Sequence, residues 1–120
     1  MIKIYHNPRC SKSRETLALV EALAKKNQEQ IEIIDYQKKP LSLFELCTLL
    51  QELGGNVQLM LRDNEDEYQT NKLEDVSTDE ALHAIIAYPK LLQRPIVSFQ
   101  GKSAIGRPPE QVLALFKESI

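Results

Sequence analysis

The alternation of apolar and polar positions divides the chain into short strands and amphipathic helices. A period of two or a short apolar-rich run predicts strands at residues 2–5, 31–36, 96–99 and 102–105. A period near 3.6 predicts helices at about 11–26, 42–53, 77–88 and from 109 onward, with shorter helical turns at 57–61 and 68–73. Gln100-Gly101 has the composition of a two-residue turn, so the last two strands should form a hairpin.

Helix ends carry local signals of their own. Ser42 stands three residues before Glu45, and Ser77 stands three residues before Glu80. This is the spacing of a capping box, in which the two side chains satisfy each other's free amide groups. Gly54-Gly55 should end the helix that starts after Ser42.

The order of elements predicts the fold class. Strand, helix and strand within the first 36 residues form a βαβ unit, which implies parallel strands and a right-handed crossover. Two strands and a helix close the chain, after a helical region at about 41–90. We therefore expect an α/β, thioredoxin-like fold with a helical insert, built as a single domain of residues 1–120.

Composition narrows the classes of function. The chain has 42% apolar and 27% charged residues and a net charge of −2, which is ordinary for a soluble protein and argues against a nucleic-acid binder. It contains no run of about 20 apolar residues that would span a membrane. Two cysteines are too few for a disulfide scaffold, and two histidines far apart do not resemble a metal site. We expect a cytoplasmic protein without a metal.

Cys10 is the leading candidate for chemistry. Asn7-Pro8 breaks the first strand, and a helical pattern begins beside Cys10. The free amides and positive dipole of a helix N-terminus favour a thiolate, the nucleophilic form of cysteine. Polar neighbours distinguish Cys10 from Cys47, which lies on a leucine-rich helical face and is expected to be a buried hydrophobe.

Two residues near Cys10 are candidates for tuning its pKa. Ser13 occupies the position where a dithiol oxidoreductase has its second cysteine, so no local disulfide can form and the resolving thiol must be external or Cys47. The Ser13 hydroxyl is expected to donate a hydrogen bond to the Cys10 sulfur. His6 is either a partner of the thiolate or a strand-end histidine with bonds of its own, and spacing does not decide between the two.

Three arginines lie at element boundaries, namely Arg62, Arg94 and Arg107. Each one alone fits a solvated surface charge. If the last two strands close over the Cys10 turn, however, the arginines beside them approach the thiolate. Arginine matches a tetrahedral oxyanion in shape and charge, and a helix N-terminus also receives anions. Together these groups predict an oxyanion pocket.

The same residues resemble a known family. The motif His6-Asn7-Pro8-x-Cys10-x-x-Ser13-Arg14, followed by Thr16-Leu17, is similar to the active-site loop of the ArsC family of glutaredoxin-coupled arsenate reductases. Later family signatures follow in order at Leu61-Arg62, Arg94-Pro95-Ile96-Val97 and Arg107-Pro108. The fuller strings at 7–14 and 105–110 look most like the YfgD-like branch.

The resemblance implies a set of site residues. Cys10 would be the nucleophile, with His6 and Ser13 tuning its pKa and Arg62, Arg94 and Arg107 holding the oxyanion. The substrate would also contact Ser11, Lys12, Ser13 and Arg14 of the active-site loop. A thioredoxin-like fold with an inserted helical region and a cis proline at Pro95 is implied as well.

The implied reaction converts arsenate to arsenite. Cys10 attacks arsenic(V), glutathione attacks the arsenylated enzyme, and glutaredoxin removes the glutathione. Glutathione is thus a reducing co-substrate and glutaredoxin a partner, with no bound cofactor and a monomeric enzyme expected.

Two alternatives stay open at the level of sequence. One keeps the glutathione-linked thiol chemistry but takes another substrate, either a different oxyanion or a glutathione mixed disulfide. The other is an Spx-like redox regulator that binds RNA polymerase. Such regulators carry Cys-x-x-Cys at this turn, and Ser13 argues against that reading.

Overall fold

The structure is a computed structural model that describes residues 1–119. The chain forms two compact units: Met1–Lys39 with the segment from Arg94 onward, and Pro40–Gln93. The first is called the sheet unit and the second the helical unit. The expected single domain of residues 1–120, with a helical insert at about 41–90, stays a prediction.

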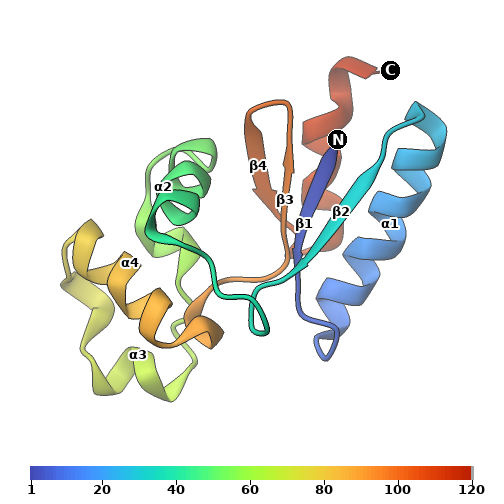
Figure 1. Ribbon diagram of the computed structural model, residues 1–120. Coiled ribbons are helices and arrows are strands. Elements are labelled where there is room, and N and C mark those ends of the chain that lie inside the picture. Colours follow the sequence, from blue (N-terminus) through green and yellow to red (C-terminus); the bar gives the residue numbers. More distant parts are fainter. Residues whose placement is uncertain (120) are drawn as a thin grey trace. The chain divides into compact units, whose positions relative to one another are not determined.

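The sheet unit contains four strands in the order β2-β1-β3-β4 (Figure 1). They are β1 (Ile2–His6), β2 (Ile31–Asp35), β3 (Ile96–Phe99) and β4 (Lys102–Ile105). β1 is parallel to β2 and antiparallel to β3, and β3 is antiparallel to β4. Helix α1 (Ser11–Asn27) makes the crossover from β1 to β2. The predicted α/β class and thioredoxin-like order of elements are confirmed.

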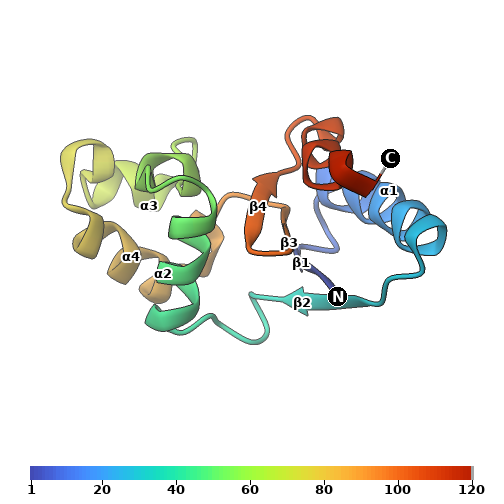
Figure 2. The same ribbon diagram turned by 90° about the horizontal axis from the view of Figure 1, so that it is seen from above.

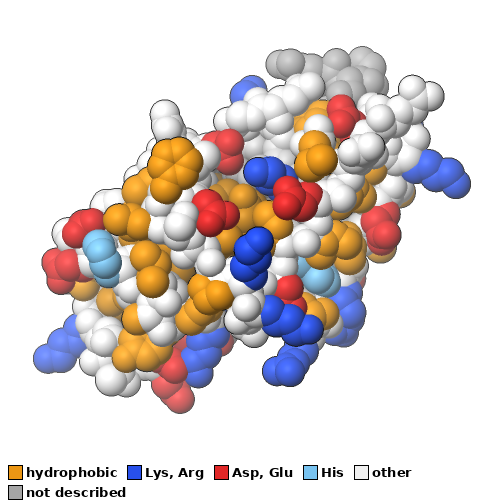
Figure 3. All heavy atoms as spheres, viewed as in Figure 1, with side chains coloured by type: hydrophobic (Ala, Val, Ile, Leu, Met, Phe, Trp, Pro, Cys, Tyr) orange, Lys and Arg blue, Asp and Glu red, His pale blue; other side chains and the backbone are white. Residues whose placement is uncertain are grey.

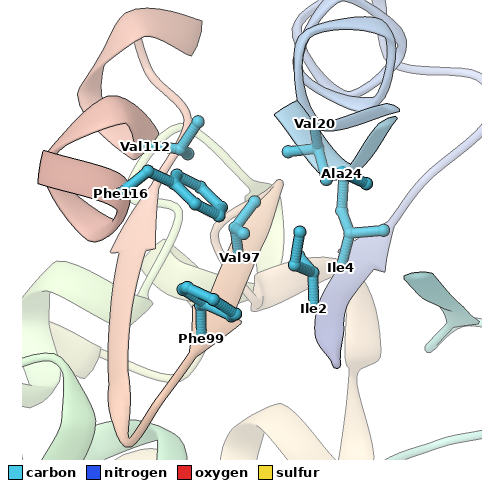
Figure 4. Close-up of a cluster of buried hydrophobic side chains, with 8 residues drawn as sticks. All are labelled: Ile2, Ile4, Val20, Ala24, Val97, Phe99, Val112 and Phe116. Carbon is cyan, nitrogen blue, oxygen red and sulfur yellow. The ribbon is translucent and has the colours of Figure 1, made fainter. Parts of the chain in front are cut away.

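Two helices cover the same face of the sheet (Figure 2). They are α1 and the 3₁₀ helix η4 (Pro109–Ser119), which was expected as an α-helix from Pro109. Alternate residues of β1 and β3 point between them and form the core (Figure 4), which consists of Ile2, Ile4, Val20, Ala24, Val97, Phe99, Val112 and Phe116. The rings of Phe99 and Phe116 stack with centroids 4.9 Å apart. Burial of this apolar surface is what holds the crossover helix and the final helix on the sheet.

The β3–β4 hairpin has the predicted two-residue turn. Gln100 and Gly101 both have positive φ, at 51° and 78°. This conformation matches the twist of the paired strands, and a glycine at the second position reduces its cost. The hairpin returns the chain after β4 to the end of the sheet where β1 terminates.

The helical unit consists of three α-helices and three short 3₁₀ turns. The α-helices are α2 (Leu43–Glu52), α3 (Asp66–Thr70) and α4 (Thr78–Ala87). The 3₁₀ turns are η1 (Val57–Met60), η2 (Leu73–Asp75) and η3 (Pro89–Leu91). The predicted turns at 57–61 and 68–73 thus correspond to η1 and to the segment from α3 to η2.

The two predicted capping boxes differ in completeness. The Ser42 hydroxyl accepts from the Glu45 amide and the Glu45 carboxylate accepts from the Ser42 amide, each at 3.1 Å. The Ser77 hydroxyl also accepts from the Glu80 amide, but Glu80 pairs with the Ser77 hydroxyl instead of its amide. Both serines therefore cap their helices, and only the first box is reciprocal.

The expectation for Cys47 is wrong, because its side chain is exposed. The buried residues of α2 are Leu46 and Leu49, so the stripe that packs inward lies to one side of Cys47. Leu43 of the same helix is exposed as well.

The described residues, 1–119, were expected to contain neither a membrane-spanning segment nor a metal site. No helix in that range has the length and apolar character needed to cross a membrane. Within the same range, no three or more His, Cys, Asp or Glu side chains are grouped so as to hold a metal ion.

Candidate active site

Asn7 shapes the loop between β1 and α1. It is buried, and its side-chain oxygen accepts a hydrogen bond from the Arg9 amide at 3.0 Å. Its carbonyl accepts from the Cys10 amide at 3.0 Å, and its own amide donates to the Ser13 hydroxyl at 2.9 Å. Asparagine readily forms a turn in which its side chain accepts a hydrogen bond from the amide two residues later. The side chain and the backbone of Asn7 together therefore hold the loop in place. This fixes where Cys10 lies.

Cys10 occupies the N-cap position of α1. Its backbone is extended, with φ −96° and ψ 124°, and its carbonyl accepts the first helical hydrogen bond from the Arg14 amide at 3.0 Å. The thiol is partly buried. The sulfur therefore faces the free amides of the first helical turn, as the strand-to-helix pattern predicted.

Arg94 and Arg107 come to the Cys10 sulfur from the other half of the sheet. Arg107 donates from Nη2 to Sγ of Cys10 at 3.3 Å and from Nε to the Arg94 carbonyl at 2.6 Å. Arg94 precedes β3 and Arg107 follows β4, and both precede a proline in a cis peptide bond. The cis bond at Pro95 was expected, and the one at Pro108 was not. The structure thus brings two of the three candidate arginines together with the thiol.

The surroundings lower the pKa of Cys10. Burial raises this pKa, but the opposing effects together outweigh it: the Ser13 amide, the Arg94 side chain, the charge of Arg107 and the Lys12 amide. The Cys10 side chain accepts no capping hydrogen bond from the first turn of α1, so we assign the two amides an electrostatic effect on the thiolate. The result is a cysteine with more thiolate at neutral pH than an ordinary one.

The Ser13 hydroxyl is not directed at the sulfur, which differs from the prediction. It lies 2.7 Å from Nδ1 of His6 and accepts from the Asn7 amide, and both Ser13 and His6 are buried. Ser13 therefore acts on Cys10 through its backbone amide, while its side chain ties the first turn of α1 to the end of β1. His6 has a strand-end bond of its own, and its link to Cys10 passes through Ser13.

The pKa of His6 also differs from its ordinary value. Burial lowers its pKa, the carboxylate of Asp35 raises it, and the charge of Arg14 lowers it, with a net decrease. Asp35 is the partner of His6 in the pairing of β1 with β2. A neutral imidazole at pH 7 follows, since the ordinary value is already 6.5.

Arg62 belongs to the helical unit. Its Nε lies 3.6 Å from a Glu65 carboxylate oxygen, and its Nη1 donates to the Gln93 side chain at 3.1 Å. Its guanidinium is thus held in a defined position within that unit. The prediction that Arg62 binds the same oxyanion as Arg94 and Arg107 stays a prediction.

The remaining loop candidates are exposed. Ser11 and Lys12 lie on the outer side of the first helical turn, where Lys12 approaches Glu15 at 3.6 Å. Arg14 donates to the Pro8 carbonyl at 3.0 Å, so it braces the loop. Contact of these residues with the substrate also stays a prediction.

Two residues with a part in this geometry were missed in the sequence. The Thr16 hydroxyl donates to the Lys12 carbonyl at 2.8 Å and lies 3.4 Å from the Gly106 carbonyl. The Gly106 backbone lies so close to the Thr16 side chain that a β-carbon at position 106 would be 2.5 Å from the Thr16 hydroxyl oxygen. The glycine immediately before Arg107 was the available signal, because glycine often marks a position where other atoms lie close against the backbone.

Comparison with known proteins gives consistent matches over nearly the whole chain. The model of the ArsC family matches residues 5–115. YfgD of Escherichia coli strain K12 is 48% identical over 117 residues, which cover 95% of each chain. An arsenate reductase of Haemophilus influenzae is 44% identical over 115 residues, or 93% of this chain and 96% of that one.

A solved structure agrees with these matches. The arsenate reductase from Vibrio cholerae superposes with a TM-score of 0.84 at 44% sequence identity, covering 95% of this chain and 96% of that one. The similarity thus includes the three-dimensional arrangement as well as the sequence.

Proposed function

This chain belongs to the ArsC family, and we propose that it reduces arsenate to arsenite at Cys10, with glutathione and glutaredoxin as electron donors. The observation that carries the proposal is the hydrogen bond from Arg107 to the Cys10 sulfur, beside Arg94. A thiolate with two guanidinium groups at a helix N-terminus suits a tetrahedral oxyanion that the thiolate can attack.

The first step forms the bond between sulfur and arsenic. The Cys10 thiolate attacks arsenic(V), and one arsenate oxygen leaves as water after taking up protons. Arginines next to the sulfur stabilise the negative charge of the oxyanion before and during the attack, when a thiolate and an anion must approach each other. We assign this role to Arg94 and Arg107, and to Arg62 from the helical unit.

The second stage transfers two electrons. A glutathione thiolate displaces a second oxygen from arsenic as water, which leaves arsenic bound to two sulfurs. A glutaredoxin thiolate then attacks the glutathione sulfur and forms a disulfide with it, and the electron pair of the broken sulfur–arsenic bond remains on arsenic. Arsenic is now arsenic(III), and water displaces it from Cys10 as arsenite.

The absence of a second thiol at the Cys10 turn supports the external donor. Ser13 is buried at that position and its hydroxyl is bonded to His6 and Asn7. Glutathione and glutaredoxin belong to a reducing compartment, so the proposal places the enzyme in the cytoplasm. We also propose that it acts as a monomer.

The test is arsenite formation from arsenate with glutathione and glutaredoxin supplied. Wild-type protein should turn over, Cys10→Ser should not, and Cys47→Ser should match wild type because Cys47 is exposed on the helical unit. Turnover by Cys10→Ser, or none by wild type, contradicts the proposal. Phosphate and sulfate as competitors then establish whether arsenate is the preferred oxyanion.

A further inference from the structure

A pocket of about 330 Å³ opens beside the Cys10 loop, on the sheet unit. Its volume lies in the usual range for small-molecule sites, roughly 300–1,000 Å³. The lining residues come from the turn between β1 and α1 and from the loop after β2, and they are Asn7, Pro8, Arg9, Asp35, Gln37 and Lys38. Figure 3 shows lysine and arginine side chains grouped around these two segments, with an acidic side chain and a histidine among them.

The walls of the pocket are held by local hydrogen bonds. Asp35 ends β2, and one of its carboxylate oxygens accepts from the amides of Gln37 and Lys38 at 3.2 and 3.3 Å. The Asn7 side chain fixes the Arg9 amide on the opposite side. The backbone that carries both cations is thus ordered, while the side chains of Arg9 and Lys38 are exposed and able to reach a ligand.

The sheet order separates this pocket from the arginines. β1 ends at the Cys10 loop, β2 lies on one side of it, and β3 and β4 lie on the other. Arg94 and Arg107 therefore reach the sulfur from the β3–β4 side, and the pocket lies on the β2 side. A second reactant in the pocket would lie beside the loop that carries Cys10, on the side away from the arginines.

We propose that this pocket binds the reducing thiol, a small thiol that carries carboxylates and an ammonium group, of which glutathione is the example. The inference rests on the proposed function, which requires an external thiol. Glutathione has two carboxylates and one ammonium group, and the pocket offers the cations of Arg9 and Lys38 and the carboxylate of Asp35. The side chains of Asn7 and Gln37 add amide groups suited to peptide bonds.

The pocket fits this ligand better than it fits the oxyanion. Arsenate carries no ammonium group for Asp35 to bind, and it is much smaller than the volume available. An acidic protein segment would use the two cations but would be repelled by the same carboxylate. Charge pairing of both signs is the feature that selects a zwitterionic small thiol.

The experiment uses the full chain with S-methylglutathione, which cannot react, followed through the backbone amides by NMR. We expect saturable shifts at residues 7–10 and 35–38. Arg9→Gln and Lys38→Gln should each weaken binding about tenfold, as expected for the loss of one hydrogen bond between charged groups. Lys26→Gln is the matched control at the far end of α1 and should bind like wild type.

A modified ligand tests the same charge pairing on the wild-type protein, so the test does not depend on whether a variant folds. S-methylglutathione with both carboxylates esterified should lose binding to the wild-type protein. Shifts that are absent, that lie elsewhere, or that are the same for the ester overturn the proposal. If glutaredoxin alone shifts these amides, the surface is a protein-docking site and the proposal is again wrong.

The outcome is independent of arsenate turnover. If the protein binds S-methylglutathione here but does not reduce arsenate, the proposed thiol pocket is supported and the proposed arsenate substrate is wrong. If the protein reduces arsenate but shows no such shifts, the proposed function is supported and the proposed thiol pocket is wrong.

Discussion

Arg107 donates a hydrogen bond to the sulfur of Cys10 at 3.3 Å across 97 positions of sequence. Its Nε is bound at the same time to the Arg94 carbonyl, so the guanidinium is oriented before any substrate arrives. Pre-orientation of this kind reduces the reorganisation needed when charge develops at the sulfur and on the oxyanion. One side chain thus links the nucleophile to the proline turn that starts β3.

Replacement of Arg107 should raise the pKa of Cys10. In Arg107→Gln the positive charge beside the sulfur is lost, while the Ser13 and Lys12 amides and Arg94 remain. The ultraviolet absorbance of the thiolate, followed against pH, should shift to higher pH in this variant. Lys102→Gln, which removes an exposed charge from the same hairpin, should titrate like wild type. Coincident curves for all three proteins would contradict the role given to Arg107.

The buried His6 should make stability depend on pH. Its folded-state pKa is lowered below 6.5, so below that pH the unfolded chain binds a proton that the folded chain does not. The contribution of His6 is therefore complete above pH 6.5 and falls with decreasing pH until the folded-state pKa is reached.

Urea denaturation across this pH range measures the effect. The free energy of unfolding of wild type should fall more steeply toward acid than that of His6→Gln. His83→Gln, which changes an exposed histidine of α4, should keep the wild-type slope. Equal slopes for His6→Gln and wild type would show that His6 does not titrate in this way.

Removal of the Ser13 hydroxyl should cost stability. The hydroxyl is fully buried, and Ser13→Ala leaves the Asn7 amide without its acceptor and His6 without its partner. A buried polar group without a partner costs about 1–3 kcal/mol. Ser11→Ala is the control, because Ser11 is exposed and its loss should change the free energy of unfolding by less than about 0.5 kcal/mol. A Ser13→Ala protein as stable as Ser11→Ala would contradict this account.

Local rules predicted what depends on neighbouring residues. The reciprocal capping bonds of Ser42 and Glu45 and the positive φ angles of Gln100 and Gly101 follow from interactions within a few residues. The position of Cys10 at the start of α1 is of the same kind, since a strand pattern, an Asn-Pro break and a helical pattern fix it.

Packing decided what the sequence left open or predicted wrongly. Cys47 is next to Leu46 in the sequence, yet it is exposed. The face of α2 that packs inward contains Leu46 and Leu49 and does not include Cys47. Ser13 was expected to bind the sulfur, but the buried His6 and Asn7 take its hydroxyl. Spacing along the chain does not show which of several polar neighbours a buried hydroxyl will meet.

Arg62 should affect substrate binding if it completes the oxyanion site. Arg62→Gln should raise the KM for arsenate about tenfold, as expected for one lost charge-assisted hydrogen bond, and leave the Cys10 pKa unchanged. Glu65→Gln, which removes the carboxylate next to Arg62, is the control for a merely structural effect and should leave KM near wild type. An unchanged KM in Arg62→Gln would exclude it from the site.

Alkylation of Cys10 across pH, with and without arsenate, tests the central claim most directly. A Cys47→Ser background leaves Cys10 as the single thiol, since the chain has two cysteines. We predict that the rate of alkylation by iodoacetamide rises with a midpoint below the ordinary pKa of a cysteine thiol, and that arsenate slows it in a saturable way. An ordinary midpoint, or alkylation that arsenate does not slow, would contradict an activated thiolate in an oxyanion site.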